Sequence, residues 1–150
     1  MKTIALLVCA AAAALAQPSN YAFAGLSYGS SLAGTAIYAR AVDKVGTYSF
    51  TMMDAVPTST KPLTVSTQIA TGIAQKLACI SIVCLYVPGA AGVSWNGPNT
   101  GWGWSSGGLA VIQPKGWKAL IAPHVRVVKS SVNNNSGYQL IGGLTFGWGF

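Results

Sequence analysis

Charged side chains are scarce in this chain, and glutamate is missing altogether. Only 7% of the 150 residues are charged, and Asp43 and Asp54 are the only acids. Soluble domains carry about 25% charged residues and spread both signs over their surface. Catalysis by paired carboxylates needs two neighbouring acids. The two aspartates lie near opposite ends of one expected strand, so we assign them turn or rim positions and expect no such chemistry.

Histidine and cysteine are also few. His124 is the single histidine, and Cys79 and Cys84 are the cysteines outside the N-terminal segment. One histidine and two separated cysteines do not form a usual zinc-ligand set, so we expect no metal and no cofactor. On one continuous strand, these cysteines face opposite sides and lie about 17 Å apart, whereas a disulfide needs Cα atoms within about 7 Å. The sequence therefore predicts two free, buried thiols.

No hydrophobic run after the N-terminus reaches the 18 or more residues of a membrane-spanning helix. The nearest, 77–93, is interrupted by Ser81, Pro88, Gly89 and Gly92. Yet 51% of the chain is hydrophobic. Apolar residues that alternate with others instead of running together are typical of a barrel that faces lipid.

The first sixteen residues have the pattern of a secretory signal peptide. Lys2 provides a positive start, an apolar stretch covers 4–15, and Ala16 ends a small-x-small cleavage motif. Cys9 follows Val8 instead of a small residue, which disfavours a lipoprotein signal. Cleavage after Ala16 would leave 17–150, or 150 − 16 = 134 residues, which is enough for one domain.

Alternation of side-chain type predicts eight strands in 17–150. Their expected ranges are 21–28, 33–42, 46–55, 63–73, 77–87, 102–113, 117–130 and 138–150. The connections after the second, fourth and sixth strands are short, and each holds a lysine: Lys44, Lys76 or Lys115. Those after the third, fifth and seventh are the longer polar loops 56–62, 88–101 and 131–137. Short turns at one end and longer loops at the other are the layout of membrane barrels.

The last strand, 138–150, has the clearest alternation of the chain. One face is large and apolar, with only Gly142 interrupting it, and consists of Phe150, Trp148, Phe146, Leu144 and Leu140. A chain that ends in this way resembles the terminal strand of small eight-stranded, porin-type outer-membrane β-barrels. The resemblance implies an all-β, eight-stranded antiparallel up-and-down transmembrane barrel, with bulky side chains toward lipid and small or polar ones in the lumen. It also implies that these five residues are the signal read by the barrel-assembly machinery.

Polar residues on the inward face would fill such a barrel. A charge on the lipid face costs about 2–4 kcal/mol near the midplane. We therefore expect Arg40 and Arg126 to point inward together with Gln68 and His124. Eight strands leave an interior that side chains can fill or that holds one small ligand. A plugged lumen is the main prediction, and a narrow anion-preferring pore is the alternative.

His124 leaves an enzymatic alternative open. Outer-membrane lipid deacylases, which eight-stranded barrels can be, pair a histidine with a serine two residues later and with a downstream acid. Here that second position is Arg126, and no acid follows Asp54. A serine–histidine pair without its orienting acid is a poor triad. We expect a protein that is not an enzyme, with His124 hydrogen-bonded in the lumen.

Tryptophans cluster near both expected ends of the barrel. Trp95, Trp102 and Trp104 lie by the longest expected loop, and Trp117 lies near the opposite rim with the C-terminal aromatics. Aromatic belts at the two membrane interfaces are the prediction, and ligand stacking on the first three tryptophans is the alternative. The lysines occur singly in turns, which favours anionic lipid headgroups over nucleic acid as partners.

These features together predict a structural or surface-exposed protein of the cell outer membrane. Its expected partners are the lipid bilayer and the assembly machinery. A soluble secreted barrel around an apolar ligand is the remaining rival, and it requires the reverse parity, with apolar side chains inside.

Overall fold

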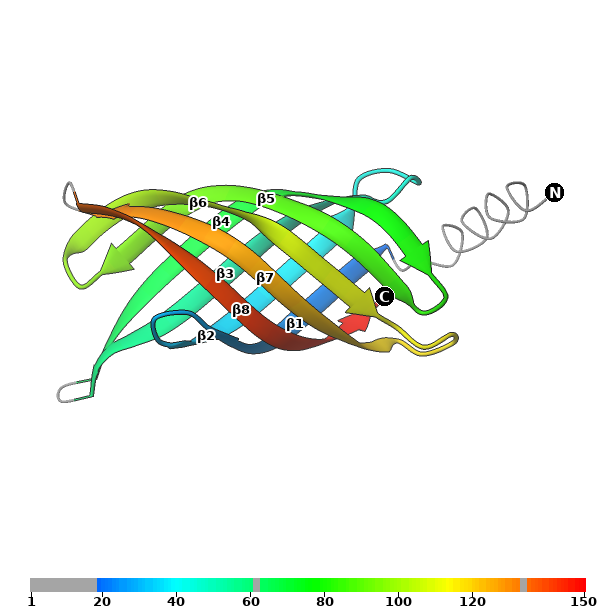
Figure 1. The fold of residues 1–150 in the computed structure, drawn as a ribbon, viewed down its shortest axis with the longest axis horizontal. Helices are drawn as coiled ribbons and strands as arrows, with labels where there is room; N and C mark the ends of the chain where they lie inside the picture. Colours follow the sequence, from blue (N-terminus) through cyan, green and yellow to red (C-terminus); the bar gives the residue numbers. More distant parts are fainter. Residues whose placement is uncertain (1–18, 61–62, 133–134) are drawn as a thin grey trace.

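The structure, a computed structural model, describes residues 19–60, 63–132 and 135–150. Its elements are β1 (Asn20–Tyr28), β2 (Leu32–Ala41), β3 (Thr47–Thr60), β4 (Leu63–Ile80), β5 (Val83–Asn96), β6 (Asn99–Ile112), β7 (Ala119–Val132) and β8 (Asn135–Gly149). Sequential strands pair antiparallel and β8 pairs with β1, which closes the barrel (Figure 1). The predicted all-β, eight-stranded antiparallel barrel is confirmed. The predicted signal peptide, 1–16, lies outside the described residues.

The two ends of the barrel differ in what they carry. The β2–β3, β4–β5 and β6–β7 connections lie at the end where β1 begins and β8 finishes, here called the terminal end (Figure 1). The other connections lie at the opposite, or far, end. Within the described ranges, no helix is long and apolar enough to cross a membrane.

The chain turns between β4 and β5 at Ser81 and Ile82. Ser81 has a positive φ of 58°, a conformation that the commonest two-residue hairpin turns require. The turn expected at Lys76 is wrong, because this residue lies within β4. The apolar run 77–87 is therefore the tip of a hairpin and not one strand. The prediction misplaced the turn because apolar residues precede and follow it, so that local composition does not mark its position.

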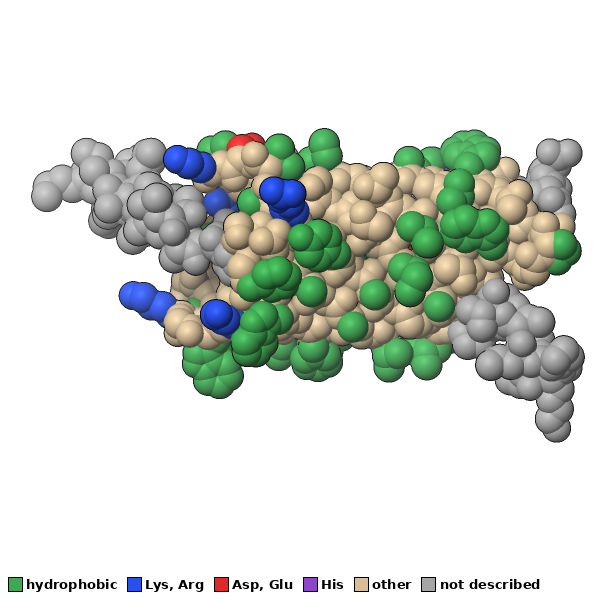
Figure 2. All heavy atoms as spheres, turned by 180° about the vertical axis from the view of Figure 1, so that it is seen from behind, with side chains coloured by type: hydrophobic (Ala, Val, Ile, Leu, Met, Phe, Trp, Pro, Cys, Tyr) green, Lys and Arg blue, Asp and Glu red, His purple; other side chains and the backbone are tan. Residues whose placement is uncertain are grey.

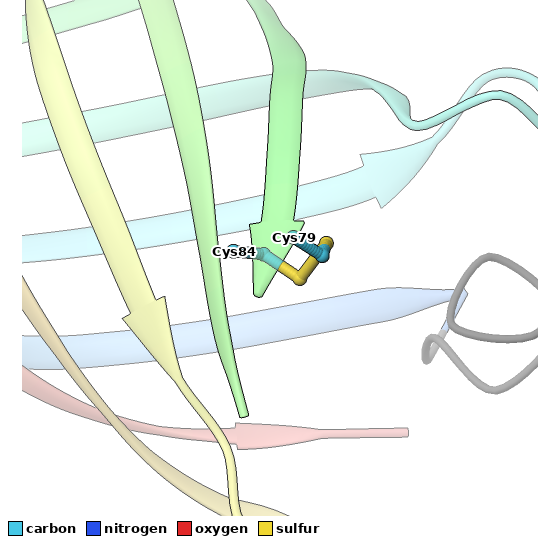
Figure 3. The surroundings of a disulfide bond; sticks show 2 residues. All are labelled: Cys79 and Cys84. Carbon is cyan, nitrogen blue, oxygen red and sulfur yellow. A yellow bond between two sulfur atoms is a disulfide. The ribbon is translucent and has the colours of Figure 1, made fainter. Parts of the chain in front are cut away.

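The same hairpin brings the two cysteines together. Cys79 in β4 lies opposite Cys84 in β5, with 4.0 Å between their Cα atoms, and the two form a disulfide (Figure 3). The prediction of free thiols is wrong. It assumed one continuous strand, whereas the intervening reversal makes these residues neighbours across the ladder.

The long loops expected at the far end are mostly strand. β3 continues to Thr60, β7 continues to Val132, and only Gly97 and Pro98 separate β5 from β6. Gly97 has a φ of 60°, which glycine adopts without steric cost. Polar and proline-containing segments look like loops by composition. Here their backbones pair with neighbouring strands over most of their length.

Side chains along β8 alternate as expected. Large apolar residues of this strand are 43–68% exposed on the outer face, whereas Thr145 and Ile141 are buried on the inner face. The outward residues include all five of the predicted set: Phe150, Trp148, Phe146, Leu144 and Leu140.

Near the terminal end, β1 and β3 have the opposite arrangement from the expected one. Tyr21, Phe23, Tyr48 and Phe50 are buried inside, while small or polar residues of these strands, such as Ser49, face outward. Because side chains alternate strictly, one buried residue fixes the face of every other residue in its strand. The rule that bulky residues face out and small ones face in is therefore wrong for these parts of β1 and β3, whereas β2 follows it, with Leu32 and Tyr38 exposed.

The buried aromatics close the terminal end of the lumen. The ring centroid of Tyr48 lies 5.4 Å from that of Tyr21 and 5.8 Å from that of Tyr86. Phe23 stacks on Tyr21 at 5.6 Å. All of these residues lie near the terminal ends of their strands. Aromatic pairs at such distances contribute about 0.5–1.5 kcal/mol each beyond the burial of their area.

Candidate functional site: a polar network in the lumen

An ion pair crosses the middle of the barrel. Arg126 of β7 reaches Asp54 of β3, with 2.6 Å between the guanidinium nitrogen Nη2 and Oδ1, and both side chains are about 5% exposed. Arg126 Nη1 also donates to Sδ of Met52 at 2.6 Å. The rim position expected for Asp54 is wrong, because β3 continues six residues beyond it and places it inside the strand.

Three further side chains extend this pair around the wall. Thr35 of β2 donates to Asp54 Oδ1 at 2.7 Å, and its hydroxyl lies 2.6 Å from that of Ser27. Ser27 of β1 is hydrogen-bonded to Nε2 of His124 at 3.0 Å. All are buried. We call Ser27, Thr35, Asp54, His124 and Arg126 the lumen network; it joins β1, β2, β3 and β7.

A glycine in β8 allows the network to span the seam between β7 and β1. Gly143 pairs with Ser27 on one side and with His124 on the other. A Cβ at this position would lie 2.7 Å from both His124 Cε1 and Ser27 Oγ. The two side chains can therefore meet over β8 only because residue 143 has no side chain.

The structure brings together three of the four predicted lumen residues. His124 and Arg126 belong to the network, and Gln68 lies beside it, paired in register with Asp54. Arg40 lies outside the lumen network, and the expectation that it faces inward is wrong. It is exposed on the outer face of β2, near the terminal end, beside Asn20 and Ser49. A guanidinium at the end of the barrel stays hydrated, so the desolvation cost of placing it on the outer face is small there.

Sequence reasoning missed Ser27, Thr35 and Asp54. Hydroxyl residues are common throughout the chain, so Ser27 and Thr35 carry no distinguishing signal. Asp54 does carry one, because an acid inside a strand of a nearly uncharged chain needs a cationic partner. Few cations lie within strands, and Arg126 is one of them.

Several polar atoms in the interior have no hydrogen-bond partner among the described residues. They are Asp54 Oδ2, Gln68 Nε2, Ser94 Oγ, His124 Nδ1 and Arg126 Nε. Asp54, Gln68 and Ser94 lie in one row across β3, β4 and β5. A buried polar atom without a partner costs about 1–3 kcal/mol. These atoms are therefore the points at which the lumen would bind water or a small polar solute.

The arrangement does not form a catalytic triad. A triad needs an acid on His Nδ1, but Nδ1 of His124 has no partner, and Asp54 is bound to Thr35 and Arg126. Ser27 is only 1% exposed, so a lipid ester outside the barrel does not reach its hydroxyl. Nor do the described residues contain a group of His, Cys, Asp and Glu side chains that could hold a metal ion.

Exposed aromatics gather at both ends of the outer wall. Towards the far end, Trp104 packs edge-on against Tyr138, with ring centroids 6.2 Å apart. Lys129 Nζ lies 5.8 Å from the centroid of Trp102 and 5.3 Å from that of Tyr138. Trp95 is exposed at the same end. Towards the terminal end lie Trp117, Trp148 and Phe150, which are all more than half exposed.

Cations collect at the terminal end, as Figure 2 shows in blue. The residues are Arg40, Lys44, Lys76, Lys115 and Lys118. The acid of this end, Asp43, accepts hydrogen bonds from the N–H groups of Val45, Gly46 and Thr47 at 2.9–3.0 Å. Hydrogen bonds from Thr47 are the main cause that lowers the pKa of the Asp43 carboxyl below its ordinary 3.8. This end of the barrel is therefore basic.

No protein-family model, curated protein or solved structure matches the chain.

Proposed function

We propose that this protein is a small outer-membrane β-barrel with a structural or surface-exposed role and a lumen plugged by side chains. The observation that carries the proposal is that apolar side chains face outward and an ion pair faces the lumen. Large apolar side chains are exposed over much of the outer wall, whereas the Asp54–Arg126 pair lies inside. Membrane barrels show this arrangement, and a barrel dissolved in water needs the reverse on its outer face.

The spacing of the exposed aromatics supports a membrane position. Trp148 pairs with Ala119 of β7, and Trp104 pairs with Lys129, which lies 129 − 119 = 10 positions along the same strand. At ~3.4 Å per residue and a tilt of ~45°, these two positions on β7 are about 24 Å apart along the barrel axis. The apolar band of outer-membrane barrels is about 25 Å tall and is flanked by aromatic girdles.

Two features support export from the cytoplasm. The N-terminal segment has the pattern of a signal peptide, and the Cys79–Cys84 disulfide is stable in oxidising compartments such as the bacterial periplasm. In this proposal the terminal end faces the periplasm, where its cations meet anionic headgroups. Phe150 and the alternating residues before it are then presented to the assembly machinery.

A plug fits the interior better than an anion-preferring pore. The charge of Arg126 is balanced by Asp54. The terminal end of the lumen is filled by Tyr21, Tyr48 and Tyr86. A conducting lumen would need an unpaired cation facing an open path.

Extraction and gel mobility test the proposal together. The protein should stay with the membrane fraction after a high-salt wash, dissolve only in detergent, and migrate differently before and after boiling. Purified protein added to a planar bilayer should produce no steady conductance. Release into buffer without detergent would refute the membrane location, and a stable anion current would refute the plug.

A further inference from the structure

The wall of the barrel is interrupted along both edges of β6. On the β5 side, register pairs stop at Tyr86 and Leu109 and resume at Gly89 and Ser106. Pro88 lies in this gap and has no N–H to donate to the ladder. The Ser106 hydroxyl donates instead to the Pro88 carbonyl at 3.2 Å.

The β7 side of the same strand has a second gap. Pairing stops at Leu109 and His124 and resumes at Ile112 and Ile121. Pro123 lies in this gap and again removes a donor. Two prolines, one on each neighbouring strand, therefore weaken the wall on both sides of Leu109.

A hollow and a cavity meet at this place. The hollow, with a volume of about 590 Å³, is open to the outside, where it is lined by exposed apolar residues such as Leu85, Val87 and Val125. The cavity lies in the lumen, has a volume of about 50 Å³, and is lined by Phe23, Phe50 and Met52 among others.

Gly108, Leu109 and His124 line both spaces. They are the residues that separate the outer surface from the interior at this point, and one of them has no side chain. The hollow also reaches Tyr86 and Gly143, which belong to the inner face of the barrel. The wall between the two apolar spaces is therefore thin here.

The chemistry of this passage selects a hydrocarbon chain. Aliphatic and aromatic carbon atoms form most of its lining, from Leu77, Leu85 and Val87 outside to Phe50 and Met52 inside. A polar solute that entered from the side would first cross the apolar hollow, where it would give up its hydration without gaining matching partners. A flexible apolar chain that leaves a hydrocarbon environment has no hydration to give up.

We propose that this opening, the β6 portal, admits one acyl chain of a membrane lipid, whose tip lies in the lumen beside Phe50 and Met52. The proposal rests on the membrane location proposed above, because the hollow then faces lipid tails. The opening lies between the aromatic groups of the two ends, at the level of Pro123 to Val125 on β7.

Photolabelling from within the bilayer tests the portal. The protein is inserted into vesicles of dioleoylphosphatidylcholine that contain a phosphatidylcholine with a diazirine near the end of one acyl chain. After irradiation, labelled residues are mapped by mass spectrometry. We expect labels on the inward residues Leu109, Phe50 or Met52, in addition to outward residues such as Val125, which any surrounding lipid can reach.

Two substitutions distinguish the portal from ordinary lipid contact. A side chain at Gly108 meets open space, so Gly108→Leu should fold and fill the opening, with loss of the inward labels. Gly34→Leu is the matched control, because Gly34 also faces outward with open space but lies on β2. Val87→Trp narrows the hollow from its outer edge and is the second blocking variant. Heat-dependent gel mobility shows that each variant has folded.

Each outcome decides the matter. Labels on outward residues alone, or inward labels that persist in both blocking variants, would overturn the portal and leave the membrane proposal intact. A protein that takes no label and dissolves without detergent would instead refute the membrane location.

Discussion

Removal of one charge from the Asp54–Arg126 pair should destabilise the barrel strongly. In Asp54→Asn the side chain keeps its shape, and its carbonyl oxygen can still accept the hydrogen bond from Thr35. The change therefore isolates the ion pair. It leaves the guanidinium of Arg126, about 5% exposed, without an anion inside the lumen.

The size of the effect follows from the distance and the burial. At 2.6 Å and an effective dielectric constant of about 20, the two charges attract each other by roughly 6 kcal/mol. Desolvation of each ion costs several kcal/mol, so the intact pair contributes little net stability. Loss of one partner leaves the desolvation of the other uncompensated. We expect Asp54→Asn, and equally Arg126→Met, to lower the free energy of unfolding by about 3–5 kcal/mol.

A double-mutant cycle gives the measurement its control. When both charges are replaced, as in Asp54→Asn with Arg126→Met, no buried ion remains, and most of the lost stability should return. Urea unfolding in phospholipid vesicles, followed by tryptophan fluorescence and gel mobility, yields the three values. A double variant that loses the sum of two large single effects would refute the reasoning. So would single variants that lose less than about 1 kcal/mol.

Three further predictions concern the seam, the C-terminus and the terminal end. Gly143→Ala places a Cβ 2.7 Å from two side chains of the lumen network and should lower the free energy of unfolding, measured in urea, by about 1–3 kcal/mol. The control variant Gly142→Ala, whose Cβ meets only ordinary contacts, should lower it less. Deletion of Phe150 removes the terminal aromatic side chain and two backbone hydrogen bonds to Asn20, so the chain should accumulate unassembled in the periplasm. The control variant Phe150→Tyr should assemble. Normal membrane fractionation of the deletion variant would count against the assembly role of Phe150. Because the pKa of Asp43 is lowered in the folded protein, its stabilising effect is present above pH 3.8 and is lost as the pH falls through the lower pKa of the folded state. An NMR titration should give a pKa below 3.8 for the Asp43 carboxyl. An unshifted pKa would contradict the hydrogen bonds that the carboxylate accepts.

Local alternation was enough to predict the architecture. Strict alternation over 138–150 identified both faces of β8, because a strand has a period of two and needs no partner for its pattern to appear. The count of eight strands followed from the same property, and so did the inward orientation of His124 and Arg126 on β7. Each of these features depends on residues close together in the chain.

Contacts between distant strands decided the rest. Which side chains of β3 point into the lumen depends on the pairing of Asp54 with Arg126, 72 residues away. The Cys79–Cys84 disulfide depends on a turn that apolar residues on both sides concealed. The gaps beside β6 arise because Pro88 and Pro123, on different strands, come to lie on either side of one segment. The sequence by itself therefore determined that this chain forms a closed sheet of eight alternating strands. Only the tertiary structure decided what fills the lumen and where the pairing in the wall is interrupted, because both depend on residues of different strands that meet in the barrel.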